Sequence, residues 1–588
     1  MKHNQCRKGL WGKTLLTVCV VILSVSLVFA RSPKISRDLE GINASGQVDV
    51  IVQFRQATPA ERHQKMLNRR GKFKRDLGMV NGGAYSMPAS ALADLAADPN
   101  VVYVSPDRPL SSTASFTPTL DYHAGTVNAP YAWGLGYNGT GIGVAVLDSG
   151  IIDIPDFHGP KGNLVVYSQN FVGNGSGSAN DQYGHGSHVA GIIAGTGAKS
   201  SGNNYVYTFQ GIADNVSLID LRVLDQNGLG TDSQVIAAIQ KAIQLKGKYN
   251  IRVINLSLGR PVYESYKLDP LCQAVEQAWK AGIVVVVAAG NDGRNNSVNT
   301  NGYGTITAPG NDPYVITVGA MNTVGTPSRA DDVIASYSSK GPTLYDHLVK
   351  PDLVAPGNRI ISTYTAGLSL NQQYPGNEVP NSLYQANGNK TASDTYYILS
   401  GTSMAAPMVS GAVALMLQQN SALTPDQVKA RLMKTAYKNL IPYDTVTDPT
   451  TGQTYNDQAD IFTVGAGYLD IQAALMNTDL APATAGSALS PPVKAVSGNI
   501  VLVKGSGVVW GTGVVWGTGV VWGTGVVWGT SVFSGTNPQG QSVLWGSGVV
   551  WGTSTLQGYG VVWGTGVVWG TSSTTHEEST AVAIYGEN

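Results

Sequence analysis

The sequence predicts an α/β protein built on a doubly wound, mostly parallel sheet, and two observations support this fold class. Five apolar runs lack polar alternation, as expected of strands buried on both faces of such a sheet: GVAVLD, VSLIDLRVL, VINLSLG, GIVVVVAAG and YVITVGA. Stretches between them, such as SQVIAAIQKAIQ, have helical period. Candidate functional residues are therefore expected at the carboxyl ends of these strands.

Residues 1–30 are typical of a secretory signal peptide. Four basic residues between Lys2 and Lys13 precede a nearly all-apolar run over residues 15–29, and Val28-Phe29-Ala30 places small residues where a signal peptidase requires them. We expect cleavage after Ala30 and a secreted, extracellular protein whose mature form has no membrane span. An uncleaved membrane anchor is the alternative, but the apolar run falls short of the about 20 residues that a span needs.

Residues 31–115 predict a small α+β domain, called the N-terminal domain below. VDVIVQF alternates as a strand, and TPAERHQKML opens a helix with Thr58 as N-cap and Glu61 completing a capping box. A short helix near residues 89–97 and the strand VVYVSPD follow. The next segment, SSTASFTPT, is predicted to be an exposed link that is open to proteolytic processing.

Residues 116–477 contain the apolar runs and form the predicted main domain. A late helix begins with a second capping-box signature, formed by Thr424 and Gln427. Residues 478–505, where Pro, Ala and Ser are frequent, are predicted to be a linker.

The hexapeptide GVVWGT recurs over residues 506–571, and a tail over residues 572–588 follows. Because six is even, Val508, Trp510 and Thr512 would share one side of an extended chain. This favours a stacked β-structure, either a β-solenoid or a sheet that assembles between chains. A flexible low-complexity tail is an equally weighted alternative.

Charge content argues against a nucleic-acid-binding protein, and cysteine content excludes a protein stabilised by intrachain disulfides. The chain has 38 basic and 38 acidic residues, but residues 121–588 carry 22 Lys+Arg and 30 Asp+Glu, which argues against a nucleic-acid partner. Cys6 and Cys19 lie in the predicted signal peptide, so Cys272 alone remains and no intrachain disulfide can form. Cys272 lies in LCQAVEQAW, whose apolar residues repeat at helical spacing, so it is predicted to be a packing residue and no nucleophile.

Asp148 ends the first apolar run, in GVAVLDSG. A buried carboxylate at a strand end stays ionised only if hydrogen bonds or a partner charge offset its desolvation. Alone it is weak evidence of function, since such residues often cap a neighbouring turn.

His185 lies between glycines in GHGSHVAGIIAG, at the start of a predicted helix whose apolar residues face the core. Its ring would project into the crevice at the strand ends, although a structural role is the commoner one for a single histidine. His188 is a competing candidate. Two histidines three residues apart need a third ligand to hold zinc, and no HExxH pattern or Cys/His cluster supplies one, so no metal site is predicted.

Ser403 lies in SGTSMAAPMVSGAVALML, in the first turn of a helix that is apolar almost all round and hence buried. Helix N-termini expose unpaired N–H groups that stabilise a developing oxyanion. Asn291 follows the strand in VVVVAAGND and could donate its side-chain amide to the same oxyanion. Taken singly, Ser403 is better explained as an N-cap and Asn291 as a turn residue.

Together these segments resemble the subtilisin-like serine proteases, the subtilases or peptidase family S8. The chain order Asp, His, Ser is that family's order. DSG, HGSHVAG and SGTSMAAP closely match its three active-site motifs, with Ser187 where the family usually has Thr. The likeness extends over roughly residues 125–477, where KPDLVAPG and GAGYLD are also similar to the family.

This resemblance implies a serine endopeptidase with broad preference for unfolded protein. Asp148 would orient and stabilise the imidazole of His185, His185 would shuttle the proton, and Ser403 would form the acyl-enzyme. Asn291 and the N–H group of Ser403 would hold the oxyanion.

The resemblance also implies how substrates and the N-terminal domain bind. INLSLG is similar to the strand that pairs with the substrate main chain, which implicates Ser257, Leu258 and Gly259, with Gly290 beside the oxyanion residue. The region over residues 58–107 is similar to the family's inhibitory propeptide. We therefore expect a precursor that removes its own propeptide, an intramolecular inhibitor, by a cut between about residues 110 and 123.

Some features depart from the family or lie outside it. The stretch over residues 366–395 is longer and more polar than usual and is expected to border the substrate cleft. No cofactor is required for the chemistry; the loop with Asp153 and Asp156 could host a structural calcium ion, but turn-forming aspartates explain it equally well. We expect a monomer unless the repeats assemble. The rival hypothesis is an inactive export scaffold whose repeats mediate assembly or cell-surface attachment.

Overall fold

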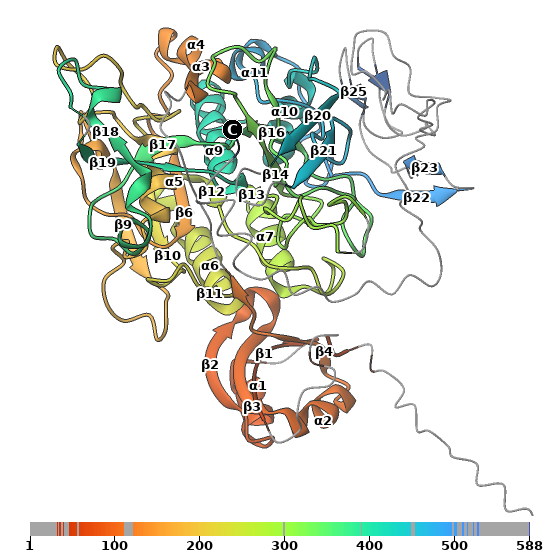
Figure 1. Ribbon diagram of the computed structural model, residues 1–588. Coiled ribbons are helices and arrows are strands. Elements are labelled where there is room, and N and C mark those ends of the chain that lie inside the picture. The colour runs from red at the N-terminus through yellow and green to blue at the C-terminus, as the bar shows by residue number, and fades with distance from the viewer. Residues whose placement is uncertain are drawn as a thin grey trace, which may run out of the picture. The chain divides into compact units, whose positions relative to one another are not determined.

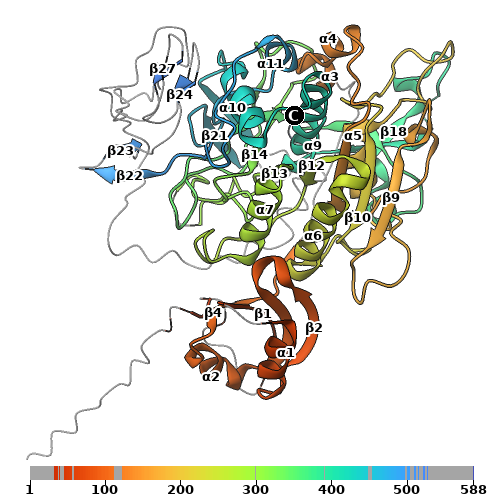
Figure 2. The same ribbon diagram turned by 180° about the vertical axis from the view of Figure 1, so that it is seen from behind.

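The structure of the chain is a computed structural model, drawn in Figures 1 and 2. It describes residues 122–496 without 298–299, 390 and 448–452, residues 46–110 without 56–57, and residues 32, 34–36, 39, 499–502, 509–510, 514–515, 521–522, 526–527 and 587. The predicted signal peptide, most of the predicted processing segment and most of the hexapeptide repeats lie outside the described residues.

The central sheet of the main domain is mostly parallel, which confirms the predicted fold class. In the described part of the chain it has eight strands in the order β15-β14-β13-β12-β6-β10-β9, with β16 also paired to β14, and β15 alone runs antiparallel to its neighbour. Every residue of the inner strands β6, β13 and β14 is buried, as the unbroken apolar runs predict. The strands are β6 (Gly143–Asp148), β9 (Val165–Asn170), β10 (Ser217–Arg222), β12 (Ile251–Leu256), β13 (Val284–Ala288), β14 (Ile316–Asn322), β15 (Val333–Ile334) and β16 (Leu353–Pro356).

Helices pack against this sheet in two pairs, α5 with α9 and α6 with α7. Helix α9 lies against β12, β13 and β14, and all its residues except the last two are buried. The helices of this domain are α3 (His123–Thr126), α4 (Ala129–Gly134), α5 (His185–Ala194), α6 (Asp232–Tyr249), α7 (Pro270–Lys280), α8 (Ser369–Gln373), α9 (Thr402–Gln419), α10 (Pro425–Thr435) and α11 (Ile471–Met476).

The order of the strands brings the candidate residues to one edge of the sheet. The chain begins the sheet at β6, adds β9 and β10 on one side, and then adds β12, β13 and β14 on the other. Asp148 is the last residue of β6, Ser257 directly follows β12, and Gly290 follows β13 by two residues. Since these strands are parallel, their carboxyl ends lie at the same edge.

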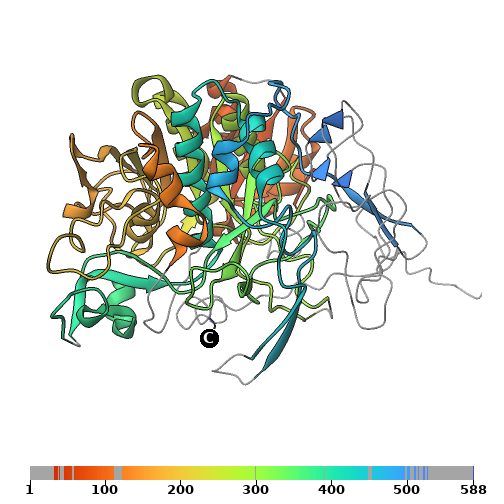
Figure 3. The ribbon, with the colours of Figure 1, turned by 90° about the horizontal axis from the view of Figure 1, so that it is seen from above.

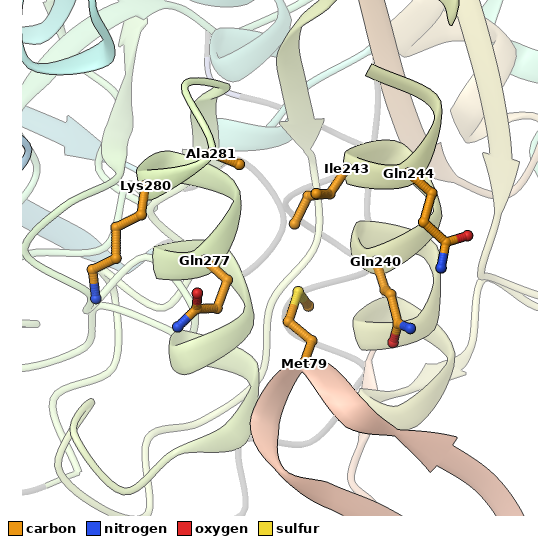
Figure 4. Close-up of a pocket in the computed structure, with 7 residues that line it drawn as sticks. All are labelled: Met79, Gln240, Ile243, Gln244, Gln277, Lys280 and Ala281. Atoms are coloured by element: carbon orange, nitrogen blue, oxygen red, sulfur yellow. The ribbon is translucent and has the colours of Figure 1, made fainter. Parts of the chain in front are cut away.

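Residues 47–106 form a separate antiparallel sheet in the order β2-β3-β1-β4, with two α-helices. Part of this N-terminal domain packs on the main domain: Leu77 and Val80 belong to the main hydrophobic core. Met79 points between α6 and α7, where Ile243, Gln240 and Gln277 line a pocket with it (Figure 4). The elements are β1 (Gln47–Phe54), α1 (Pro59–Leu67), β2 (Lys72–Leu77), β3 (Gly82–Pro88), α2 (Leu92–Ala97) and β4 (Val101–Pro106).

The main domain also contains several smaller sheets. The stretch over residues 366–395, called the inserted stretch below, contains β18 (Glu378–Pro380) and the start of β19 (Ala392–Leu399). These two strands pair with each other, and β19 also pairs with β17 (Ile360–Thr363). The hairpin of β20 (Tyr443–Thr447) and β21 (Thr454–Gln458) extends from the body of the domain, as Figure 3 shows in blue-green. Strand β5 (Pro109–Leu110) pairs with β11 (Gly230–Thr231), and β7 (His158–Gly159) pairs with β8 (Gly162–Asn163).

Part of the segment predicted to be a linker packs on the main domain. Ser490 Oγ donates to Asp352 Oδ1 at 2.6 Å, and the N–H of Val493 donates to the carbonyl of His347 at 2.7 Å. These contacts are polar, so a composition of Pro, Ala and Ser gave no sign of them. The linker continues as the hairpin of β22 (Val493–Val496) and β23 (Asn499–Leu502).

Within the repeats, the described residues form two parallel strand pairs. Strand β24 (Val509–Trp510) pairs with β26 (Val521–Trp522), and β25 (Val514–Val515) pairs with β27 (Val526–Val527). Each pair joins residues two hexapeptides apart. The architecture of the whole repeat segment stays a prediction.

None of the helices in the described part of the chain is both long and apolar enough to cross a membrane.

Candidate active site

Asp148 and His185 meet at the carboxyl end of β6. His185 Nδ1 lies 2.7 Å from Asp148 Oδ1, and both side chains are buried. His185 is the first residue of α5, and the preceding Gly184 has φ +112°, a conformation that side chains disfavour. Gly186 is needed as well, because a Cβ there would lie 2.2 Å from the carbonyl oxygen of Gly150. The two glycines therefore seat the histidine directly on the turn that follows Asp148.

Ser403 is the second residue of α9, a helix that packs with α5. Its Oγ donates to the carbonyl of Ser257 at 3.1 Å, and Ser257 Oγ donates to the carbonyl of Ser403 at 2.7 Å. Among the described residues, Nε2 of His185 is buried and has no hydrogen-bond partner. The structure thus places Ser403 at the sheet edge that carries Asp148 and His185, with its hydroxyl held by Ser257.

Asn291 lies beside the N-terminus of α9. Its Oδ1 accepts hydrogen bonds from the N–H of Thr402 at 2.9 Å and from Thr402 Oγ1 at 3.0 Å. Thr402 Oγ1 also accepts a hydrogen bond from the N–H of Gly290 at 3.1 Å. These contacts to Oδ1 orient the side-chain amide of Asn291 at the start of α9.

Two of the residues predicted to bind substrate, Gly259 and Gly290, lie against Thr307. A Cβ on Gly259 would lie 2.5 Å from Thr307 Oγ1, and a Cβ on Gly290 would lie 2.6 Å from Thr307 Cγ2. Leu258 is buried next to Gly259. Thr307 therefore fills the space between the two backbone segments, a contact that the sequence alone did not reveal.

Asp181 joins the segments that carry Asp148 and His185, and it was missed in the sequence analysis. Its Oδ1 accepts hydrogen bonds from Ser149 Oγ at 2.8 Å and from the N–H groups of Tyr183 and Gly184 at 2.9 and 2.8 Å, and its Oδ2 accepts one from the N–H of Ser187 at 2.9 Å. One carboxylate thus joins the residue after Asp148 to the turn that begins α5. Its place four residues before the histidine, ahead of a glycine-containing turn, was the only available signal.

His188 does not share the site, although it lies on the same helix as His185. Its Nε2 lies 3.1 Å from the carbonyl oxygen of Ile360 and 3.0 Å from that of Tyr397. Burial, assisted by the nearby His185, lowers the pKa of His188 to about 3. It is therefore a neutral packing residue that ties α5 to β17 and β19.

The inserted stretch packs on the turn that precedes His185. The N–H of Ser369 donates to the carbonyl of Gln182 at 3.2 Å, and the N–H of Leu370 donates to that of Tyr183 at 3.0 Å. A Cβ on Gly184 would contact Leu368 and Leu370 at 3.6 Å. Helix α8 therefore lies beside the candidate site.

Asp153 and Asp156, in the loop considered for a calcium ion, have different hydrogen-bond partners. Asp156 is buried and accepts hydrogen bonds from the N–H of Lys199 at 2.7 Å and from Tyr396 Oη at 2.5 Å, whereas Asp153 is exposed and lies 2.7 Å from His158 Nε2. The contacts of both carboxylates fit the alternative of turn-forming aspartates. The part of the chain that the structure describes contains no cluster of three or more His, Cys, Asp or Glu suited to a metal ion.

Cys272 is buried in α7, and its thiol donates to Asn311 Oδ1 at 3.3 Å. Burial raises the pKa of this thiol well above its usual value, with Asp269 as a second cause. These contacts fit the predicted packing role.

Comparisons with known proteins show which family the chain is similar to. The model of the subtilase family, Peptidase_S8, matches residues 139–467. The chain is 36% identical over 374 residues to serine protease AprX of Bacillus subtilis (strain 168), covering 62% of this chain and 76% of that one. It is 32% identical over 424 residues to subtilisin E of the same organism, covering 70% and 93%.

Among solved structures, the chain is similar to fervidolysin from Fervidobacterium pennivorans, described as a keratinolytic enzyme related to subtilisin. The TM-score is 0.54 at 22% identity, and the match covers 75% of this chain and 62% of that one. At this identity the likeness concerns the fold.

Proposed function

This chain belongs to the subtilase family of serine endopeptidases, and from this premise we propose that it cleaves proteins and peptides through an acyl-enzyme on Ser403. The pairing of His185 with Asp148 carries the proposal. The buried Nε2 on the far side of the imidazole supports it, because that nitrogen has no other partner among the described residues.

In the proposed mechanism, Nε2 of His185 takes the proton of Ser403 Oγ as the oxygen attacks the carbonyl carbon of the substrate, and then gives it to the leaving amine. Asp148 keeps a proton on Nδ1 and stabilises the imidazolium. Water then attacks the acyl-enzyme by the same route and releases the new carboxylic acid.

The negative charge of the tetrahedral intermediate is held by Nδ2 of Asn291 and the N–H of Ser403. The contacts from Thr402 to Asn291 Oδ1 support this role, since they fix the amide in advance of the reaction. The positive end of the α9 dipole adds to the same stabilisation.

The substrate main chain pairs with Ser257, Leu258 and Gly259 on one side and approaches Gly290 on the other. Main-chain pairing is insensitive to side chains, so a broad sequence preference follows. The side chain before the cleaved bond would then lie toward Thr307.

The N-terminal domain acts as an intramolecular inhibitor that the enzyme later removes. Leu110 pairs antiparallel with Gly230 of the main domain, which supports this docking. Asp107 supports the docking because it accepts hydrogen bonds from the N–H and Oγ of Ser233, at 2.8 and 2.6 Å, and so caps the N-terminus of α6.

A buried ion pair supports the same docking. Arg108 donates to both carboxylate oxygens of Glu264, at 2.7 and 2.6 Å, and its guanidinium lies over the ring of Tyr263. Ser36, at the start of the N-terminal domain, also donates to Glu264 at 2.7 Å. Both ends of this domain thus meet on one carboxylate.

Export through the signal peptide over residues 1–30 places the activity outside the cell, and the repeats are a candidate for surface attachment. Catalysis requires no cofactor, and we expect a monomer unless the repeats assemble. The rival function is an inactive scaffold for the repeats; the filled positions of Asp148, His185, Ser403 and Asn291 weigh against it.

A labelling experiment tests the proposal. A fluorophosphonate should label the secreted protein on Ser403, and casein hydrolysis should disappear in Ser403→Ala. Mass spectrometry of the secreted protein gives both mature termini. Absence of labelling in a folded, processed protein would favour the scaffold, and casein hydrolysis that survives Ser403→Ala would refute the nucleophile.

A further inference from the structure

Glu587, the penultimate residue of the chain, is fully buried against the main domain. Its Oε1 accepts hydrogen bonds from the N–H of Ser336 at 2.8 Å, from Ser336 Oγ, and from the guanidinium of Arg294 at 2.9 Å. Burial of a carboxylate is costly unless charge and hydrogen bonds compensate for the lost water. These three contacts compensate one oxygen; Oε2 is buried without a partner among the described residues, and burial raises the pKa of Glu587 despite the nearby Arg294.

Asn358 binds the main chain of the same residue at two points. Its Nδ2 donates to the carbonyl of Glu587 at 2.9 Å, and the N–H of Glu587 donates to Asn358 Oδ1 at 2.9 Å. A side-chain amide that pairs with both polar groups of one peptide residue fixes the position and direction of that residue. Side chain and main chain of Glu587 are therefore both recognised.

The side chain of Arg294 also makes contacts that do not involve Glu587. Its Nε donates to Ser336 Oγ at 2.7 Å, and its guanidinium lies 4.9 Å from the ring centre of Tyr455. The side chain is almost fully buried. Such an arginine is suited to binding a carboxylate because little side-chain freedom is lost on contact.

The contact site is built on the loops that form the active site. Arg294 lies three residues after Asn291. Gly357, next to Asn358, accepts hydrogen bonds from Tyr337 Oη at 2.9 Å and from the N–H of Gly401 at 2.7 Å. Gly401 precedes Ser403 by two residues. The end of the chain is thus anchored to a rigid part of the main domain.

We propose that Arg294, Ser336 and Asn358 form a receptor for the C-terminal end of this same chain, so that the predicted repeat segment over residues 506–571 is attached to the main domain at both ends. On one side it is joined through the packed segment that ends near Val493, and on the other through Glu587. A single cut beyond the repeats therefore leaves the C-terminal fragment bound.

The first test is hydrogen exchange on the full-length chain carrying Ser403→Ala, which prevents self-digestion. The N–H of Ser336 donates to Glu587, so peptides containing Ser336 should exchange about 10-fold faster in Glu587→Ala. Glu578→Ala, in the same tail, is the matched control and should exchange as the parent does. Equal exchange in the parent and in Glu587→Ala would overturn the proposal.

The second test cuts the chain. A recognition sequence for a site-specific protease is inserted after Thr571, and the cut protein is passed over a sizing column. The C-terminal fragment should co-elute with the parent at the mass of one chain and be lost in Glu587→Ala and Asn358→Ala. Loss from the parent, retention by both variants, or a dimer that exchanges tails would each overturn it.

Folding and activity are kept separate from these outcomes. Melting temperatures show whether the variants fold. If Asn358→Ala unfolds, Glu587→Gln takes its place. This variant keeps the shape of the side chain but loses its charge, so it should retain less of the C-terminal fragment than the parent. Neither readout requires catalysis. The receptor therefore stands or falls independently of the proposed protease mechanism.

Discussion

Ser257 and Ser403 exchange two hydrogen bonds, each hydroxyl donating to the carbonyl of the other residue, at 2.7 and 3.1 Å. The carbonyl of Ser257 is one that a paired substrate strand would also need. A substrate N–H at that carbonyl would displace Ser403 Oγ, and Nε2 of His185 is the acceptor without another partner in the described part of the chain. In the proposed mechanism, substrate binding would thereby free the hydroxyl of Ser403 for activation.

Asn291→Asp should separate the two functions of the amide. The aspartate retains an oxygen for Thr402 but loses the donor and places a negative charge near the oxyanion. We expect kcat to fall by at least 10²-fold, the lower bound measured for the corresponding donor in subtilisin itself, with KM little changed. Steady-state kinetics on a peptide anilide measure this, and an unchanged kcat would remove Asn291 from the oxyanion site.

Thr307→Gly should change which peptide bonds are cut. Removing the side chain opens the space between Gly259 and Gly290. The ratio of kcat/KM for substrates with Phe to those with Ala before the cleaved bond should rise about 10-fold, which corresponds to roughly 1.4 kcal/mol. Thr305→Gly is a neighbouring control that should leave the ratio unchanged, and a parallel loss for both substrates would contradict the prediction.

Asp181→Asn should slow catalysis by disturbing the turn before His185. An amide nitrogen in place of either carboxylate oxygen would face a donor, either Ser187 N–H or the group of three around Oδ1. We expect kcat to fall about 10-fold or more, together with a lower melting temperature. Asp331→Asn, at an exposed position, is the control. A change in KM alone would argue against this positioning role.

His188 should make stability depend on acid pH. Its pKa is about 3 in the folded protein and near 6.5 when unfolded, so between these values the unfolded chain binds a proton that the folded chain does not. The free energy of unfolding should therefore fall as pH drops from 6.5 toward 3, by at most roughly 5 kcal/mol. Denaturant titrations of Ser403→Ala should show a shallower fall in His188→Gln and no change in the exposed control His158→Gln.

Arg108→Ala should loosen the N-terminal domain, because it leaves Glu264 buried without its cation. In full-length Ser403→Ala, a Glu-specific protease should digest residues 34–110 about 10-fold faster when Arg108 is replaced. Arg55→Ala, an exposed arginine of the same domain, should behave as the parent does. Equal digestion of all three proteins would show that the ion pair does not hold this domain.

The sequence by itself determined the fold class and the candidate residues, because both are written in local patterns. Unbroken apolar runs identify strands buried on both faces, and glycine-flanked motifs mark Asp148, His185 and Ser403 where backbone and side chain must approach closely. A pattern of this kind needs only neighbouring residues, so it can be recognised without knowing how distant segments meet.

Only the tertiary structure decided which distant groups share a contact. Asp181, Thr307 and Glu587 carry no distinctive motif, yet each has at least one partner far away in the chain that gives it its role. The same is true of His188. Because it lies on the same helix as His185, the sequence made it a competing candidate. Its contacts with two carbonyl groups from other strands show that it is a packing residue. Hydrogen bonds and burial depend on positions in space, and several arrangements of the same segments would have satisfied the local pattern equally well.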